Sequence, residues 1–156
     1  MTLTGTTGSR VRGDFLLSPL FLLSLILLLF NDLYLKLNYP GLVSGILSDA
    51  AGIVFFPIFL VAVAEFFASI IPRKPWAQPS WFIVATISIA FLFVIMKYTT
   101  WGESVFVSLT EWVRDLIGKP LGFMQRGLVG DPLDLLALLL IPVPILFGFR
   151  VRRSSN

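Results

Sequence analysis

Residues 51–71 read AGIVFFPIFLVAVAEFFASII, an apolar run that contains one charged residue, Glu65, and one proline, Pro57. At about 1.5 Å of rise per residue, a helix of this length spans ~30 Å, the thickness of the hydrocarbon core of a bilayer. The run therefore predicts a transmembrane helix, and lipid is the solvent in which the rest of the chain has to be interpreted.

The composition of the whole chain agrees with this prediction. Of its 156 residues, 56% are hydrophobic and only 13% are charged, whereas soluble domains carry about 25% charged residues. The sequence has no cysteine and no histidine, which excludes disulfides, thiolate or imidazole metal ligands and Ser-His-Asp triads. We expect no cofactor and no metal site. The net charge of +3 is too small to indicate nucleic-acid binding.

The hydrophobic runs predict an all-α bundle of four transmembrane helices. The spans cover about 15–35, 51–71, 81–98 and 133–149. Together they form one membrane domain, 15–149, between a flexible polar tail, 1–14, and a basic tail, 150–156. Residues 31–50, which contain Pro40, Gly41 and Gly45, are expected to form a loop around the end of the first span.

A fifth helix is predicted between the third and fourth spans. Within 103–118, Val105, Leu109, Trp112 and Leu116 recur at helical spacing, with polar residues on the other side. This pattern is typical of an amphipathic helix that lies on the membrane surface or against the bundle.

The distribution of charge predicts the orientation. Basic residues concentrate in the two tails and in the loop between the second and third spans, with Asp14 the only acid among them. The positive-inside rule therefore favours a multi-pass protein of the cell inner membrane with both termini in the cytoplasm. The basic residues in question are Arg10, Arg12, Arg73, Lys74, Arg150, Arg152 and Arg153.

Polar side chains, mostly acids, gather at the predicted outer ends of the spans. Carboxylates there could hold a cation, relay protons or, where two share one proton, act as an aspartyl acid/base pair. Asp49 with Asp131 or Asp134 is the candidate catalytic pair. The whole set comprises Asn31, Asp32, Lys36, Asp49, Lys97, Asp131 and Asp134.

Helix capping is a simpler explanation of the same residues. Ser48 or Asp49 can cap the second span, and Asp131 followed by Pro132 and Asp134 is typical of a helix start. Asp32 and Lys36 can pair at i and i+4. The second and fourth spans also show a weak internal repeat. The spacing from Asp49 to Pro57 equals the spacing from Asp134 to Pro142. Each proline could break its helix at a similar depth.

Glu65 is the second candidate, because a carboxylate inside a membrane costs up to ~3 kcal/mol on insertion scales. It could line a transport or proton pathway, or it could hydrogen-bond hydroxyl groups such as that of Ser88 on the third span. Small residues at Ala64 and Ala68 could let helices approach closely, within the bundle or in a homo-oligomer.

Several short motifs resemble those of a group of small, functionally uncharacterised bacterial integral membrane proteins. The motifs are N-D-L-Y-L-K at 31–36, P-G at 40–41, G-I-L-S-D-A-A-G at 45–52 and D-P-L-D-L-L-A-L at 131–138. The group reads G-K-L-S-D-F-A-G and D-P-T-D-L-x-A-L, so Ile46, Ala50 and Leu133 depart from it. The resemblance implies a bacterial inner membrane but no function.

The scarcity of reactive residues favours an interaction or assembly subunit without catalysis of its own, whose partners would be the bilayer and a membrane protein or a second copy. Two alternatives stay open. One is a small ion, solute or proton pathway that uses Glu65 and the outer acids. The other is an intramembrane aspartyl hydrolase.

Overall fold

The structure, a computed structural model, describes residues 13–39, 41–70, 78–117 and 132–153, and within these ranges the chain is helical without a strand. The short elements are a 3₁₀ turn, η1 (Asp14–Leu17), a π-helix, η2 (Asn31–Leu35), α2 (Lys36–Asn38) and a 3₁₀ helix, η4 (Pro132–Leu140). The longer helices are α1 (Pro19–Phe30), α3 (Leu42–Ala68), α4 (Pro79–Tyr98), α5 (Thr100–Ile117) and α6 (Pro142–Arg153).

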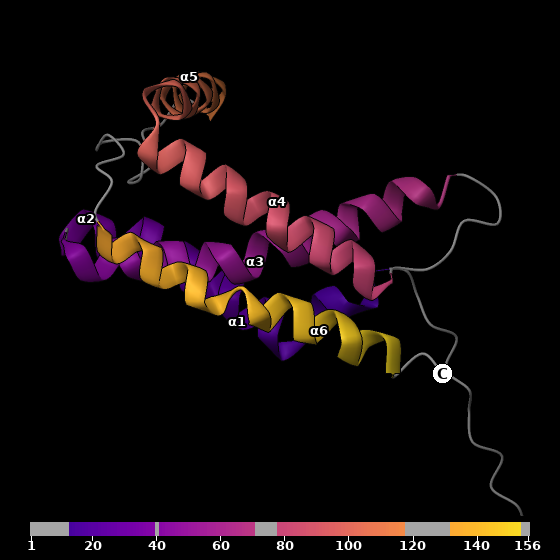
Figure 1. Ribbon diagram of the computed structural model, residues 1–156. Coiled ribbons are helices and arrows are strands. Elements are labelled where there is room, and N and C mark those ends of the chain that lie inside the picture. The colour runs from indigo at the N-terminus through magenta and orange to yellow at the C-terminus, as the bar shows by residue number, and fades with distance from the viewer. Residues whose placement is uncertain (1–12, 40, 71–77, 118–131, 154–156) are drawn as a thin grey trace, which may run out of the picture.

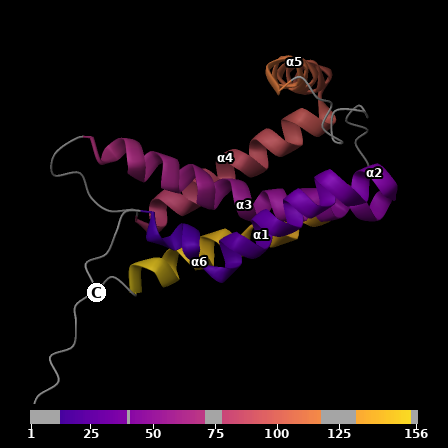
Figure 2. The ribbon, with the colours of Figure 1, turned by 180° about the vertical axis from the view of Figure 1, so that it is seen from behind.

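Four helical segments are long and apolar enough to cross a membrane, which confirms the predicted all-α four-helix bundle. They are Pro19–Asn38, Leu42–Ala68, Pro79–Tyr98 and Leu133–Val151. Successive segments run in opposite directions, so the end of α1 and the starts of α3 and η4 lie at one end of the molecule (Figures 1 and 2). The protein is a multi-pass membrane protein.

The predicted loop over residues 31–50 is wrong. The first span continues as helix through Asn38, and α3 begins at Leu42 rather than at residue 51. Ser44 supports the early start, since its hydroxyl donates to the Gly41 carbonyl at 2.9 Å and accepts from the Gly41 N–H at 3.3 Å. The polar residues of 31–50 suggested a loop. In the structure, several of them lie in helices and find partners on neighbouring helices.

Pro57 and Pro142, the two prolines of the weak internal repeat, have different effects on their helices. α3 continues unbroken through the buried Pro57. The fourth span changes from 3₁₀ to α-helix at Pro142, where the Ile141 N–H donates to the Leu138 carbonyl at 3.1 Å. Pro142 has no N–H with which to bond that carbonyl, so the 3₁₀ bond takes its place. Of these two spans, the fourth has the break and the second does not.

The core lies where α3 crosses α4 and α6, toward the end of the bundle that holds the start of α1. Ile58, Val61 and Phe82 are at most 1% exposed. Phe15 packs edge to face on Phe82 and on Phe147, with ring centroids 5.5 and 6.5 Å apart. These rings join η1, α4 and α6, so η1, which precedes α1, is part of the packed structure.

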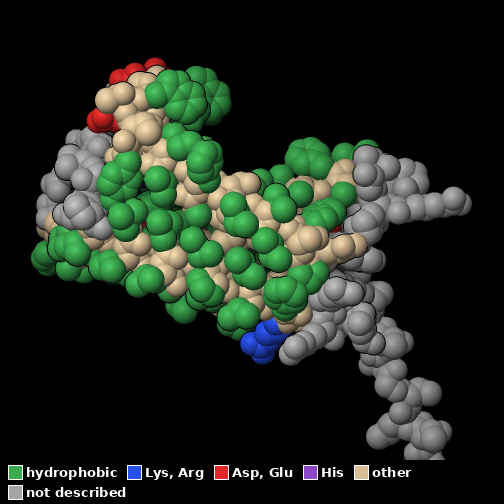
Figure 3. Space-filling view, viewed as in Figure 1, with side chains coloured by type: hydrophobic (Ala, Val, Ile, Leu, Met, Phe, Trp, Pro, Cys, Tyr) green, Lys and Arg blue, Asp and Glu red, His purple; other side chains and the backbone are tan. Residues whose placement is uncertain are grey.

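Outside this core, many large hydrophobic side chains are exposed, and they are spread over the face of the bundle that Figure 3 shows. Such a surface is unsuited to water and matches the hydrocarbon of a bilayer. α5 follows α4 and lies across the long axis of the bundle. In Figure 1, α5 is viewed along its own axis, whereas α4 is viewed from the side. Its acidic side chains and its hydrophobic ones face different sides (Figure 3).

Candidate functional site

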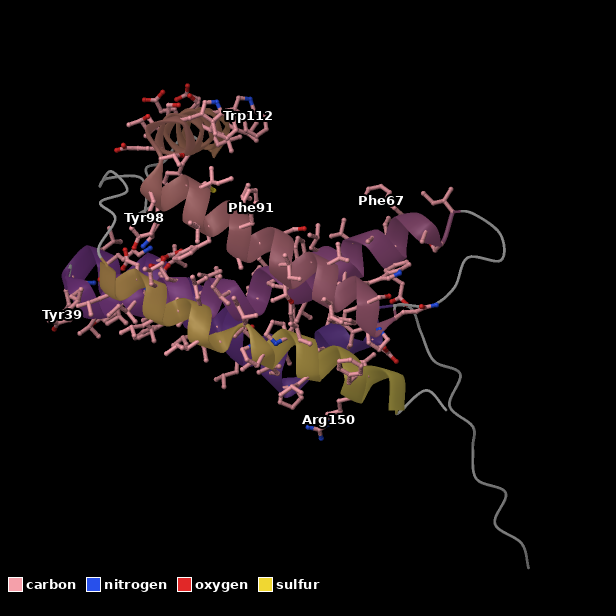
Figure 4. All side chains as sticks on the ribbon, viewed as in Figure 1. Tyr39, Phe67, Phe91, Tyr98, Trp112 and Arg150 are labelled. Carbon is pink, nitrogen blue, oxygen red and sulfur yellow. The ribbon has the colours of Figure 1, made fainter. Side chains whose placement is uncertain are left out.

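Three charged residues from three spans meet at one end of the bundle. The Lys97 ammonium at the end of α4 is ion-paired with the Asp49 carboxylate of α3 and lies 2.6 Å from Asp134 Oδ2 of η4. All three side chains are at most 15% exposed. Tyr98, the next residue after Lys97, marks this end in Figure 4.

The local structure explains why these side chains converge. Because α3 begins at Leu42, Asp49 lies two turns inside the helix and cannot be its N-cap, so the capping explanation is wrong for this residue. Asp134 follows Pro132, the first residue of η4, in the first turn as predicted, but it also reaches Lys97. Lys97 lies in the last turn of α4, where a cation is favoured by the helix dipole.

A second polar group fixes the first span to α3. Lys36 Nζ lies 2.7 Å from Asp32 Oδ1, as the i, i+4 spacing predicts. The same Nζ donates to Ser48 Oγ at 2.9 Å, and the Ser48 hydroxyl donates to Asp32 Oδ1 at 3.1 Å. Ser48 directly precedes Asp49 in α3, so the two polar groups lie side by side and are described together as one cluster.

Asn31 lies at the inner edge of this cluster and is fully buried. Its Nδ2 donates to the Ser44 carbonyl at 2.8 Å and approaches Asp32 Oδ1 at 3.5 Å, which fixes the orientation of the amide. The Asn31 Oδ1 has no hydrogen-bond partner among the described residues. Asn31 opens the π-helix η2, an irregularity that often occurs at functional positions in helices.

The cluster contains three carboxylates, of Asp32, Asp49 and Asp134, and two ammonium groups, of Lys36 and Lys97. Among the described residues of the cluster, carboxylates thus outnumber ammonium groups by one. Carboxylates and amines in low-dielectric surroundings interact strongly, and each group here has an oppositely charged neighbour. The arrangement can hold all four spans together at this end of the molecule.

Glu65 lies at the other end of the bundle and is fully buried. α3 ends at Ala68, so Glu65 is in its last turn rather than deep in the span. Glu65 Oε2 accepts the backbone N–H of Gly13 at 2.8 Å. Gly13 has φ of 74°, a left-handed conformation that glycine adopts at no steric cost. The carboxylate thus holds the chain that leads into the first span.

One further predicted residue, Ser88, does not join either site. Ser88 is exposed on α4, whereas Glu65 is wholly buried. Asp131 lies outside the described residues. The sequence did not reveal the central role of Lys97. A lysine at the end of an apolar run, followed by Tyr98 and Trp101, also fits a simple anchor at the membrane interface.

An open groove of about 680 Å³ lies at the Glu65 end, between the start of the first span and α6. Its walls are mostly apolar, and Asp14 and Arg150 contribute charged groups. The charged cluster around Lys97 does not line this groove.

Comparisons of the chain with protein-family models, with curated proteins and with solved structures found no match. Any function assigned to the chain therefore rests on the geometry and chemistry of its own residues.

Proposed function

We propose that this protein is a membrane-embedded assembly subunit that performs no catalysis of its own. The observation that supports this most directly is the pairing of Lys97 with both Asp49 and Asp134. The carboxylates best placed for chemistry are engaged in linking α3, α4 and η4. A rigid bundle with its charges paired internally is suited to presenting surfaces to another membrane protein.

The interior between the two charged ends supports the same proposal. Among the described residues, the buried side chains there are apolar apart from Ser24 and Thr86. Their hydroxyls donate to carbonyls of their own helices, Phe21 at 2.8 Å and Phe82 at 2.6 Å. A solute or ion that moved from Asp49 to Glu65 would have to cross this packed apolar region.

Site-specific photocrosslinking in native membranes tests the proposal. A photoreactive phenylalanine analogue would replace Glu111 on α5, Phe91 on α4 or Leu139 on η4, one at a time; all three positions are exposed. We expect a discrete protein adduct from one of these faces and lipid adducts from the others. An adduct of twice the chain mass would identify a second copy as the partner. Lipid adducts alone from every face would contradict the proposal.

A small proton or cation pathway is the second candidate, favoured by the gathering of three carboxylates at one end of the bundle and by the Asn31 Oδ1, which lacks a hydrogen-bond donor within the described chain. Carboxylates gathered at low dielectric favour uptake of a proton or a cation. Reconstituted vesicles containing a pH-sensitive dye test this. Flux that is lost in Asp49→Asn and kept in Glu103→Gln, on exposed α5, would favour the pathway over the assembly proposal.

The hydrolase hypothesis has the least support. An aspartyl pair needs two carboxylates that share a proton and hold a water between them. Lys97 is ion-paired with both Asp49 and Asp134, so an ammonium group, rather than a shared proton and a water, joins the two carboxylates. Hydrolysis of a peptide or ester substrate that is abolished by Asp134→Asn would restore the hypothesis.

We also propose a bacterial inner membrane with both termini in the cytoplasm, on the basis of the charge distribution and the motif resemblance. The chain has no cysteine, so single cysteines can report sidedness. Ser155→Cys should be protected from a membrane-impermeant maleimide in intact cells, whereas Glu111→Cys should be labelled. The reverse pattern would invert the topology.

A further inference from the structure

We propose that the groove between the start of the first span and α6 binds one zwitterionic phospholipid with a primary ammonium headgroup, of the phosphatidylethanolamine class. The groove is open, measures about 680 Å³ and lies at one end of the bundle. This inference is independent of the assembly proposal, because it concerns the opposite end from the Lys97 cluster.

The position of the groove matches the level of lipid headgroups. Asp14 immediately precedes the first span, which begins at Pro19, and Arg150 lies at the end of the fourth, which ends at Val151. Both charged side chains therefore sit where a span leaves the hydrocarbon. Arg150 is exposed and is labelled on the lower edge of α6 in Figure 4, pointing away from the bundle.

The walls fit an acyl chain. Leu17 and Leu20 line the groove from the first span, and Val143, Leu146 and Phe147 line it from α6. Val143 and Arg150 are seven positions apart in α6, so the apolar wall extends ~10 Å from the arginine toward the membrane interior. A headgroup held at Arg150 would place the first part of its chain against these side chains.

Charge complementarity selects the headgroup. Arg150 offers a planar set of N–H donors that suits a phosphodiester, and Asp14 offers a carboxylate that suits a primary ammonium. A carboxylate accepts several hydrogen bonds, so an existing partner of Asp14 does not prevent this contact. The Ser18 hydroxyl accepts the Phe21 N–H at 3.3 Å as the cap of α1, and its own O–H can still donate to a phosphate oxygen. Every phospholipid offers that oxygen, so among the lining residues it is Asp14 that favours a primary ammonium headgroup.

Native mass spectrometry of the full chain tests the proposal. The protein would be released from micelles with equal amounts of phosphatidylethanolamine, phosphatidylglycerol and phosphatidylcholine. We expect one retained phosphatidylethanolamine, at least fivefold over either competitor. Arg150→Gln should lower total retention at least fivefold, and Asp14→Asn should shift the preference toward phosphatidylglycerol. Equal retention of the three lipids, or a preference for phosphatidylglycerol in the unaltered protein, would overturn the proposal.

Two substitutions of leucine by tryptophan, one inside the groove and one outside it, separate a loss of lipid binding from misfolding. Leu146→Trp places an indole in the groove, and Leu139→Trp makes the same change on an exposed position of the same span that does not line it. Retention should fall at least fivefold in Leu146→Trp and stay unchanged in Leu139→Trp, with both proteins equally helical by circular dichroism. Unchanged retention in Leu146→Trp would overturn the proposal.

Discussion

Lys97 at the end of α4 and Asp134 in the first turn of η4 form an ion pair with 2.6 Å between Nζ and Oδ2, although both belong to segments that appear apolar in sequence. The same ammonium pairs with Asp49 of α3. Removing one partner from a buried pair leaves uncompensated charge, which costs more than replacing the whole group by apolar residues. The stability of the bundle should therefore depend strongly on Lys97.

Lys97→Met should lower the free energy of unfolding by about 3–5 kcal/mol, because it leaves two carboxylates without their shared cation. The matched control is Arg150→Met, which removes an exposed cation from α6 and should cost much less. Chemical unfolding in detergent micelles, followed by circular dichroism, measures both. The ion cluster would lose its structural role if the two variants were equally stable.

Gly148→Ala should destabilise the bundle by about 1–3 kcal/mol, the usual cost of overpacking. A Cβ at Gly148 would lie 2.6 Å from Phe82 Cγ, in the packed contact between α6 and α4. Gly45→Ala is the matched control, since nothing lies within 4 Å of its Cβ and alanine is the better helix former. Thermal unfolding should show a lower midpoint for Gly148→Ala alone.

Two substitutions of Asn31 test whether its side-chain oxygen, Oδ1, which has no hydrogen-bond partner among the described residues, affects stability. Asn31→Leu loses the hydrogen bond to the Ser44 carbonyl but removes an unsatisfied buried acceptor, so it should cost about 1 kcal/mol or less. Asn31→Asp adds a carboxylate beside Asp32 and should cost substantially more. Unfolding by denaturant compares the two. A larger loss in Asn31→Leu than in Asn31→Asp would mean that Oδ1 binds a donor that stabilises the protein.

Glu65→Leu should release the chain around Gly13 from the bundle. Losing a hydrogen bond to a charged acceptor costs about 1.5–3 kcal/mol, so exchange of the Gly13 amide should accelerate by at least about tenfold. Glu65→Gln keeps an acceptor and should change exchange less, and Ser69→Ala at the exposed end of α3 should leave it unchanged. Hydrogen exchange with mass spectrometry reads the segment 13–17. Equal exchange in all three variants would show that another contact holds this segment.

Trp112 should lie in the membrane interface. It is 65% exposed on α5, and its side chain lies on the side of α5 toward which α4 runs across the bundle (Figure 4). With the other three tryptophans changed to phenylalanine, bromine on the upper acyl chain should quench its emission. Moving the indole to the neighbouring position, by Glu111→Trp with Trp112→Phe, should reduce that quenching. Equal quenching at both positions would place α5 away from the interface.

The sequence predicted the fold class because membrane insertion depends on a local property. A run such as 51–71 must be helical in lipid, since the backbone has no other way to satisfy its hydrogen bonds there. Capping at Asp49 was predicted from the same local information and is wrong, because α3 starts two turns earlier than the hydrophobic run suggests. Asp32 and Lys36 were predicted correctly because i, i+4 spacing is itself local.

The sequence by itself determined that four apolar helices cross a membrane, since hydropathy and length are properties of each segment alone. Only the tertiary structure decided that Lys97 joins Asp49 to Asp134, and that Glu65 binds Gly13 rather than Ser88. These contacts join residues far apart in the chain and depend on where each helix starts and how it is rotated. A shift of one residue turns a side chain about 100° around a helix, so composition and spacing could not choose the partners.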